Sequence, residues 1–503
     1  MVTENLNSDS STDPIGAVFT PVSWCEWIIE RYGLFEEWQN GKTIFDPTSG
    51  EGNFIIALLN IAERKGIKIS NSSLENLYIN ERQIEYIHNF KKRLMDDFGI
   101  HFPEKNIYNT DIVLNRIDCK FDILLGNPPW ITFNNLSDNY KENIKPFFKK
   151  YIYQGGGNSM LLGSSRADLA TLICVKTIAE NLSFGGSCYF FIPISLFFGT
   201  GANDNFRTFQ VNDQPFQVSE VLGLSQLGIF PNISTDYGFF TAKLGSQTQF
   251  PIPFLEFEKD ITQHDKFDLI QLQNTRSMIK LKVDSKLSIP RIISADQPRQ
   301  GVNTCGLRHL FVFDTMTDLE NGEVEVSNQK SKQILPKKYI YPLFSKNTKS
   351  TKYILIPYHR NGKILTPEDV ANEPKLSNYL NQTRSQLESR KGVMLSAQIK
   401  KGLWWALLGV GKYSFSKYKV IWQSYGDTNF HPTIIDGNIQ GDQSMQAFIP
   451  VDSYETAVRI CHELSKQEVN EFLHALGGKG KMNWAQPGKI KLILDIQKEG
   501  VLF

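Results

Sequence analysis

The sequence predicts an α/β fold in its first half, followed by a C-terminal domain of mixed α+β structure. Short apolar runs alternate with segments of helical periodicity from residue 16 to about residue 245, which is typical of a parallel sheet covered by helices on both faces. This alternation is lost in the second half, and 503 residues exceed what one ordinary core requires. We therefore expect two domains that meet near residue 245.

Five strand candidates and two helix candidates define the first domain. Each strand candidate ends in a polar or Gly/Pro cluster, and the helix candidates carry apolar residues at intervals of three and four. In such a sheet, ligands bind beyond the carboxyl ends of the strands, which is where the unusual clusters of this sequence lie. The strand candidates are 42–50, 74–81, 105–111, 121–129 and 186–194, and the helix candidates are 52–66 and 82–99.

The composition narrows the class of protein. With 41% hydrophobic and 21% charged residues, the chain resembles a soluble globular protein. It has no run of about 18 apolar residues for a membrane span, and its polar, acidic N-terminus differs from a signal peptide. We therefore expect a cytoplasmic protein with a disordered segment at residues 1–18. The six cysteines lie far apart without a CxxC motif, so no metal site and no disulfide framework are expected.

One stretch of the second half is strongly basic. Residues 331–420 hold 17 Lys and Arg against 4 Asp and Glu, although the formal net charge of the whole chain is +1. Such an asymmetry predicts contact with a polyanion, and a solvated lysine-rich face is the simpler alternative. The candidate phosphate contacts are Lys412, Lys417 and Lys419.

The turn "IFDPTSGEGNF" follows the first strand candidate. Gly50 and Gly52 allow the main chain to approach a ligand closely before a helix begins near Asn53. The spacing of the glycines fits neither a phosphate-binding loop nor a dinucleotide-binding loop, so the turn alone could equally be a plain connection. The next two strand ends carry Glu81 and Asp111. Together, the loop and the two acids outline a pocket for an adenosine moiety.

The segment "LLGNPPW" ends the fourth strand candidate. Pro128 and Pro129 remove two N–H donors and stiffen the backbone, so this loop displays carbonyl oxygens. Asn127 adds a side-chain carbonyl, and the two acceptors could hold both hydrogens of an aromatic amine and draw its lone pair out of ring conjugation. Trp130 offers a flat face on which a base could stack. A tight turn with a core tryptophan is the structural alternative.

These motifs resemble those of S-adenosylmethionine-dependent N6-adenine DNA methyltransferases. "NPPW" follows "FDILLG", with "FDPTSGEGNF" and "FTPVSWCEWIIE" upstream, and this motif order resembles the gamma class. The segment "LGLSQLGIFPNISTDYGFFTAKL" is similar to the one whose phenylalanine, here Phe230, packs on the extruded base. The second half resembles the target recognition domains of type II and IIG restriction methylases. The resemblance implies a Rossmann-like methyltransferase sheet over residues 19–245 and a target recognition domain over residues 246–503.

The resemblance also implies a role for each matching residue. Glu81 would bind the ribose hydroxyls of the cofactor, and Asp111 its adenine amino group. The catalytic set would be Asn127, Pro128, Pro129 and Trp130, with Trp130 and Phe230 stacked on the target base. Residues 131–166, which include "QGGGN" at 154–158, would form a mobile loop near the DNA backbone. The residues implied to border the methionine end and adenosine are Thr20, Pro21, Asp46, Pro47, Gly50, Gly52, Phe54 and Asn127.

The sequence thus predicts a site-specific, adenine-specific DNA methyltransferase that uses S-adenosylmethionine. The adenine must flip out of the duplex, because its amine is paired and stacked inside the helix. We expect the modification component of a restriction-modification system, acting as a monomer on double-stranded DNA. The resembling IIG enzymes carry a nuclease domain before the methylase, whereas the first motif here begins near residue 19. The sequence therefore leaves open whether a separate restriction endonuclease is a partner of this protein.

Three alternatives differ in substrate or activity. N4-cytosine methylation also attacks an exocyclic amine, and only the resemblance favours adenine, since cytosine enzymes more often have serine at the position of Asn127. Protein-glutamine methylation uses a similar NPPY loop, but the basic stretch and the additional domain argue against it. A DNA-binding module with a decayed site would not be expected to keep Asp46, Gly50, Gly52, Asn127 and both prolines.

Overall fold

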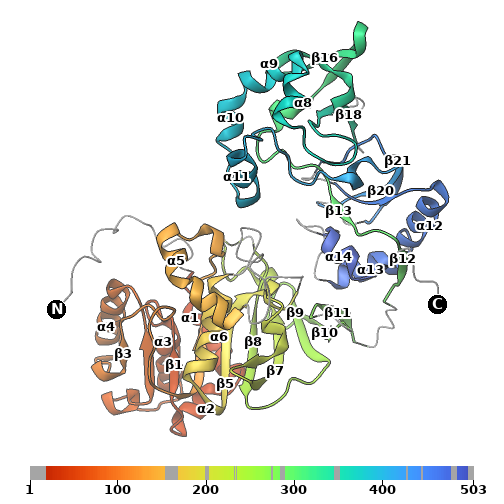
Figure 1. Cartoon of the computed structure of the whole chain (residues 1–503). Helices are drawn as coiled ribbons and strands as arrows, with labels where there is room; N and C mark the ends of the chain where they lie inside the picture. The colour runs from red at the N-terminus through yellow and green to blue at the C-terminus, as the bar shows by residue number, and fades with distance from the viewer. Residues whose placement is uncertain are drawn as a thin grey trace. The chain divides into compact units, whose positions relative to one another are not determined.

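A computed structural model of the chain divides into two compact units (Figure 1). Unit 1 is Met1–Ser285 and unit 2 is Lys286–Phe503. Almost all of the polar N-terminus and the "QGGGN" segment lie outside the described residues. The described residues are 18–152, 168–198, 203–231, 233, 235–272, 276–283, 289–344, 352–425, 429–442, 446–476 and 484–496.

The centre of unit 1 is a mixed sheet in which eleven strands are described. Its order is β11-β10-β9-β7-β8-β5-β4-β1-β2-β3, and β6 pairs with β7. Strands β3, β2, β1, β4 and β5 run parallel, and β8 lies antiparallel between β5 and β7. The strands are β1 Ile44–Asp46, β2 Leu77–Asn80, β3 Ile107–Tyr108, β4 Phe121–Gly126, β5 Leu182–Pro193, β6 Gln210–Val211, β7 Gln214–Gly223, β8 Tyr237–Leu244, β9 Ile252–Phe257, β10 His264–Gln271 and β11 Met278–Lys282.

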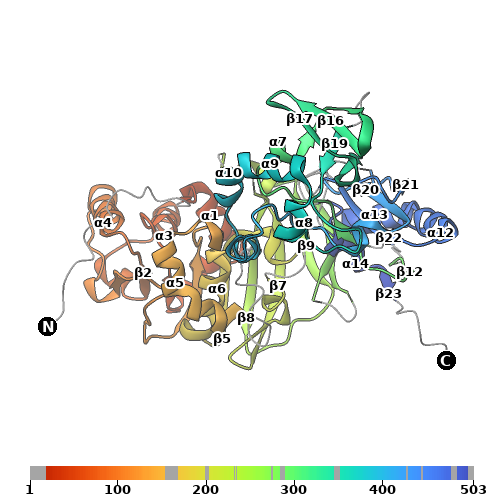
Figure 2. The same cartoon turned by 45° about the horizontal axis from the view of Figure 1, so that its top comes forward.

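Helices cover both faces of this sheet, as the alternation along β5 demonstrates. Phe191 belongs to the core shared with α1 to α4, whereas Phe190 belongs to the core shared with α6. Both views of the chain show α6 against β5 (Figures 1 and 2), and Figure 1 shows α3 beside β1. The helices are α1 Val22–Arg31, α2 Leu34–Gln39, α3 Asn53–Arg64, α4 Ile84–Phe98, α5 Asp138–Phe147 and α6 Leu169–Asn181.

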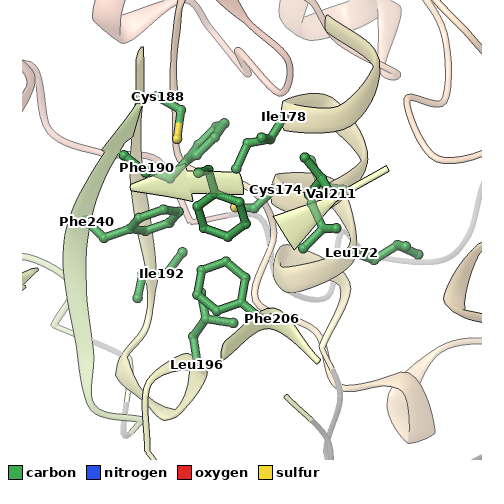
Figure 3. Close-up of a cluster of buried hydrophobic side chains, with 14 of the residues drawn as sticks. Leu172, Cys174, Ile178, Cys188, Phe190, Ile192, Leu196, Phe206, Val211 and Phe240 are labelled. Carbon is green, nitrogen blue, oxygen red and sulfur yellow. The ribbon is translucent and has the colours of Figure 1, made fainter. Parts of the chain in front are cut away.

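The α6 face contains the aromatic core shown in Figure 3. Cys174 and Ile178 of α6 face Phe190 of β5 and Phe240 of β8, and Leu172 belongs to the same core (Figure 3). All five side chains are fully buried, so helix and sheet pack directly against each other. Close packing of this kind transmits strain and fixes the strands relative to the helices. The carboxyl ends of the strands are therefore held on a rigid platform.

Unit 2 has mixed α+β structure with several small sheets. The sheets have the orders β12-β23, β13-β22-β20-β21, β14-β19-β18 and β15-β16-β17. The strands are β12 Ile292–Ser294, β13 Arg299–Gln300, β14 Val312–Phe313, β15 Thr315–Asp318, β16 Glu323–Asn328, β17 Ser331–Pro336, β18 Ile340–Leu343, β19 Lys352–Leu355, β20 Tyr418–Gln423, β21 Thr433–Asp436, β22 Gln446–Val451 and β23 Leu494–Ile496. The helices are α7 Arg308–Phe311, α8 Pro367–Ala371, α9 Pro374–Gln382, α10 Arg384–Glu388, α11 Val393–Lys400, α12 Tyr454–Leu464, α13 Gln467–Ala475 and α14 Pro487–Lys491.

The predicted fold class is confirmed, but the units divide at a different place from the expected domains. A boundary at residue 245 falls between β8 and β9, inside the sheet. Strand β9 pairs in parallel with β7, and β10 and β11 continue from it as an antiparallel extension. These backbone hydrogen bonds keep β9 to β11 in unit 1, which ends at Ser285.

No helix among the described residues is long and apolar enough to cross a membrane.

Candidate active site

The carboxyl ends of β1, β2 and β4 bring most of the predicted site residues to one edge of the sheet. Strand β1 pairs in parallel with both neighbours, with Ile44 opposite Leu77 on one side and Ile123 on the other. The three strands are parallel and in register. Asp46 ends β1, and Glu81 and Asn127 directly follow β2 and β4, so the three residues lie at the same edge of the sheet.

The loop after β1 is folded around a buried carboxyl group. Asp46 is 2% exposed, and its Oδ1 accepts a hydrogen bond from the Thr48 N–H at 3.0 Å. Burial, together with the charge of Glu81, raises the pKa of Asp46 to about 8, and the hydrogen bond from Thr48 opposes this shift. A Cβ at Gly126 would lie 2.8 Å from the same oxygen. The glycine before Asn127 therefore allows β4 to pass close to Asp46.

Asn80 ties this loop to the end of β2. Its Nδ2 donates to the Pro47 carbonyl at 2.9 Å, and its backbone carbonyl accepts from the Ser49 N–H at 2.9 Å. Sequence reasoning missed Asn80, although it directly precedes the predicted acid. The signal was its position as a buried amide at a strand end, where an apolar residue is the usual choice.

Glu81 holds the glycine loop from the other side. Its Oε2 accepts from the Gly50 N–H at 2.9 Å, and its Oε1 accepts from the Gln83 N–H at 2.8 Å. Burial raises the pKa of this carboxyl, and the backbone hydrogen bonds oppose that shift. The carboxylate keeps further acceptor positions, because each of its oxygens has two lone pairs. Ribose binding by Glu81 is compatible with this arrangement and stays a prediction.

The two loop glycines differ in what surrounds them. Both have positive φ, +55° at Gly50 and +71° at Gly52. A Cβ on Gly50 would lie 2.6 Å from the exposed Phe19 ring, whereas one on Gly52 would lie 2.2 Å from the buried Phe90 ring of α4. Gly52 is therefore required for packing between α3 and α4, and only Gly50 faces a side chain that can move aside for a ligand.

Three other predicted cofactor residues have structural contacts in the described structure. Pro21 is exposed and precedes α1, where its carbonyl accepts from the Trp24 and Cys25 N–H groups. Pro47 is buried, and its carbonyl accepts from Asn80. Phe54 lies in the first turn of α3 and is 3% exposed, with its ring against Phe191. These three residues support the loop and the segment before α1.

Asp111 follows β3 and has both carboxylate oxygens engaged. Its Oδ1 accepts from the Val113 and Leu114 N–H groups at 2.9 and 3.2 Å. Its Oδ2 accepts from the hydroxyl of Tyr140 on α5 at 2.9 Å. Sequence reasoning did not find Tyr140, because α5 begins well after β3 in sequence with no motif to connect the two.

The side-chain amide of Asn127 has a defined orientation. Its Nδ2 donates to the Val18 carbonyl at 3.0 Å and to Thr20 Oγ1 at 3.1 Å. Its Oδ1 is buried and has no hydrogen-bond partner in the described part of the chain. Thr20, which the resemblance placed beside the cofactor, thus directs the Asn127 oxygen away from the N-terminal segment. The loop presents one unused acceptor, with Pro128 buried next to it.

The two rings that were predicted to stack on the target base, those of Trp130 and Phe230, touch each other. The rings of Trp130 and Phe230 contact each other edge to face, with centroids 5.1 Å apart and an interplanar angle of 86°. Phe230 is 4% exposed and packs in the core, and Tyr237, which sequence reasoning missed, lies 5.5 Å from Trp130. A base can stack between Trp130 and Phe230 only after these touching rings separate. Stacking of both rings on a target base stays a prediction.

The predicted DNA-binding lysines of unit 2 divide into two groups. Lys412 and Lys417 are exposed. Lys419 is 0% exposed, and its Nζ donates to the Gly437 and Ile439 carbonyls at 2.6 and 2.7 Å. The prediction that Lys419 contacts phosphate is therefore corrected: β20 places this side chain inside the unit, where it holds the segment after β21.

Comparison with known proteins assigns the chain to a family. The sequence model of the family described as N-6 DNA Methylase matches residues 5–280, more than half of the chain. The chain belongs to the N-6 DNA methylase family. The type II methyltransferases M.HincII of Haemophilus influenzae and M.HindII of the Rd strain of that species are each 23% identical over 234 residues. The match covers 46% of this chain and 38% and 36% of theirs, so it spans little more than a third of these relatives.

Solved structures support the fold of this N-6 DNA methylase. A nuclease-deletion mutant of the Type ISP restriction-modification enzyme LlaGI, in complex with a DNA substrate mimic, has a TM-score of 0.52 and 12% identity over 86% of this chain and 48% of that chain. The ATP-dependent Type ISP enzyme LlaBIII bound to DNA has a TM-score of 0.50 and 12% identity over 87% of this chain and 34% of that chain. Both alignments are longer than unit 1, so the likeness in fold extends into the C-terminal unit.

The strand ends of this methylase fit the cofactor expected for its family, S-adenosylmethionine. Within the described residues, Thr48 Oγ1, Ser49 Oγ and Asn80 Oδ1 are buried without a hydrogen-bond partner. An unsatisfied buried polar group costs about 1 to 3 kcal/mol. Three such groups beside Asp46 and Glu81 favour a ligand rich in hydroxyl and amino groups at this edge of the sheet.

If the chain transfers methyl groups to DNA, as proposed below, Thr20→Val should slow this reaction. The change keeps the shape of the buried side chain and removes the acceptor that orients Asn127, so the amide gains freedom to turn. The loss of one hydrogen bond predicts a fall of about 3- to 10-fold in the single-turnover rate at saturating cofactor. Thr20→Ser keeps the hydroxyl and is the matched control. Equal rates for the two variants would show that Thr20 does not orient the amide.

We expect Lys419 to make the stability of unit 2 depend on pH. Burial lowers the pKa of Lys419 to about 7 from its ordinary value of 10.5. Between these values the unfolded chain binds more protons, so the stability due to this group rises with pH by about 1.4 kcal/mol per pH unit and is flat below pH 7. Pulsed thiol labelling of Cys461 in a urea series measures unfolding of unit 2.

Lys419→Met is expected to remove this rise, and Lys417→Met, at an exposed neighbouring lysine, is expected to retain it. The same pH dependence in Lys419→Met and in the unmodified chain would contradict the assignment.

Proposed function

We propose that this N-6 DNA methylase transfers a methyl group to N6 of an adenine flipped out of duplex DNA. The observation that carries the proposal is the buried, unpartnered Oδ1 of Asn127 at the carboxyl end of β4, within the described part of the chain. Membership of the family supports activity as a DNA methyltransferase, and the adenine target and base flipping are further steps of the proposal.

The acceptors of the NPPW loop suit an exocyclic amine. Asn127 Oδ1 and the Pro128 carbonyl would each accept one N–H of the amine, which directs the nitrogen lone pair away from the ring. Neither acceptor is a titrating base, so the pair cannot be lost to protonation near neutral pH. S-adenosylmethionine, when bound, supplies the activated methyl group. The loop contributes orientation, because reacting atoms about 3 to 3.5 Å apart and in line gain most of their rate from positioning.

The closed aromatic cluster implies that base entry is coupled to movement of Trp130. This indole is half-buried, and its Nε1 is buried without a partner among the described residues, whereas the Phe230 ring belongs to the core. Trp130 is therefore the ring that moves, and Phe230 is the fixed face. A base stacked on an aromatic side chain gains about 1 to 3 kcal/mol, which offsets the ring packing that opening disrupts.

We assign DNA recognition to unit 2 and place the enzyme in a restriction-modification system. The relatives named above are type II methyltransferases, and the Type ISP structures contain DNA or a mimic of it. The exposed Lys412 and Lys417 belong to the stretch with 17 basic and 4 acidic residues. A separate restriction endonuclease would then recognise the same DNA site. We propose that the methylase acts as a monomer.

Expression in a host that lacks adenine methylation tests the proposed function. Single-molecule sequencing of the host DNA would report N6-methyladenine in one recurrent sequence, and the same host with Asn127→Ala would lack it. N4-methylcytosine in the recurrent sequence would establish the alternative target. Unmodified DNA alongside folded, expressed protein would refute DNA methylation by this chain alone.

Asn127→Ala tests the proposed mechanism in vitro. The variant loses one acceptor and keeps the prolines and the DNA-binding surface, so the loss is expected in the chemical step and not in binding. Removal of one such contact lowers rates by about 100- to 1,000-fold. The measurements are the single-turnover rate on the methylated sequence and the affinities for cofactor and DNA. Asn40→Ala, at an exposed position after α2, makes the same change away from the strand ends. A rate in Asn127→Ala near that of this control would exclude the mechanism.

The lysine pair gives a separate prediction about DNA binding. Replacing both Lys412 and Lys417 with Gln should weaken binding to every DNA sequence and reduce the slope of log affinity against log salt by about 2. The control replaces Lys332 and Lys352, whose Nζ atoms lie 2.9 Å from Glu325 and Asp314. These two lysines are already ion-paired, so their loss should change the slope less. An unchanged slope in the Lys412 and Lys417 variant would show that these side chains do not contact phosphate.

A further inference from the structure

The hydroxyl of Tyr140 connects helix α5 to the acid that follows β3. Tyr140 Oη donates to Asp111 Oδ2 at 2.9 Å, and Asp111 Oδ1 is held by two backbone N–H groups. We propose that Tyr140 is a positioning residue for the adenine ring of the cofactor, acting through Asp111. The inference rests on the proposed function and on the ligand that the sequence resemblance implies for Asp111, the adenine amino group of the cofactor.

The hydrogen bonds of Asp111 leave one acceptor position of the carboxylate unused. An ionised carboxylate has about four lone-pair sites. Two N–H groups use those of Oδ1, and the Tyr140 hydroxyl uses one of Oδ2. The carboxylate is thereby fixed in rotation, with one site on Oδ2 still able to accept a hydrogen bond. An amino group on an aromatic ring supplies such a donor.

The surroundings keep Tyr140 a donor. Burial raises the pKa of its hydroxyl well above the ordinary range, and the neighbouring Asp111 charge raises it further. Arg82 lies over the Tyr140 ring at 5.7 Å, and its Nη1 is 3.6 Å from Asp111 Oδ2. The Arg82 side chain is 62% exposed, so its charge is screened by water and competes weakly for the carboxylate.

The position of Tyr140 in the chain adds a second consequence. Tyr140 lies in the first turn of α5, which Ser137 caps by accepting the Tyr140 N–H at 3.4 Å, and its ring packs against the α6-side core. Helix α5 begins shortly after Trp130 of the NPPW loop. One side chain therefore joins the adenine end of the cofactor pocket to the polypeptide that carries the target-base loop.

Calorimetry on the full chain with two ligands tests this inference. The ligands are S-adenosylhomocysteine and its analogue with hydrogen in place of the adenine 6-amino group. Tyr140→Phe keeps the packed ring and removes the hydroxyl, so the affinity for S-adenosylhomocysteine should fall by about 3- to 10-fold. The affinity for the deaminated analogue should stay unchanged, because that ligand has no group for Asp111.

Two further variants make the outcome unambiguous. Tyr151→Phe removes a tyrosine hydroxyl that donates to Glu180, outside the pocket, and should leave both affinities unchanged. Asp111→Asn should abolish the preference for the amino group. Equal losses for both ligands in Tyr140→Phe would mean a purely structural role, and tighter binding would mean that the hydroxyl competes with the cofactor; either result overturns the inference. Failure of the unmodified chain to bind either ligand would instead refute the proposed function.

Discussion

Buried acceptors without hydrogen-bond partners are the constraint on which the organisation of unit 1 depends. The described structure leaves Ser49 Oγ, Asn80 Oδ1 and Asn127 Oδ1 unsatisfied at one edge of the sheet. Most buried polar atoms in folded proteins find a partner, and each exception costs stability. A cluster of exceptions at the place where α/β sheets bind ligands is explained by a ligand that supplies the missing donors.

The fold places these atoms by simple means. Parallel pairing of β4, β1 and β2 brings three strand ends together, and Gly126 allows β4 to pass within contact of Asp46. The close-packed aromatic core beneath α6 fixes the strands (Figure 3). Thr20 then orients the Asn127 amide from a segment more than a hundred residues away in sequence. Contacts between segments that are distant in sequence therefore determine where the polar atoms at this edge of the sheet point.

The sequence predicted those parts of the site that depend on local backbone chemistry. Glycine at positive φ after β1 and consecutive prolines after β4 leave recognisable patterns, because few other residues satisfy those conformations. Asn80 and Tyr140 were missed, since an amide at a strand end and a tyrosine on an amphipathic helix acquire their roles only when distant segments meet.

The incorrect predictions have the same origin. Counting charge along the sequence made Lys419 a phosphate contact, but β20 is buried on both faces, and Lys419 donates to two carbonyl groups inside the unit. The loss of strand and helix alternation after residue 245 suggested a new domain, but β9 to β11 extend the existing sheet without helices between them. The direct contact between Trp130 and Phe230 depends on core packing that no motif encodes.

A crystal structure of the full chain with S-adenosylhomocysteine would test the central claim most directly. We predict a ligand across the carboxyl ends of β1 and β2, with its ribose at Glu81, its adenine at Asp111, and hydrogen bonds to the acceptors around Ser49 and Asn80. Asn127 Oδ1 would stay free to accept from a target amine. A ligand bound elsewhere, or those acceptors satisfied by protein groups while the ligand is absent from this edge, would contradict the claim.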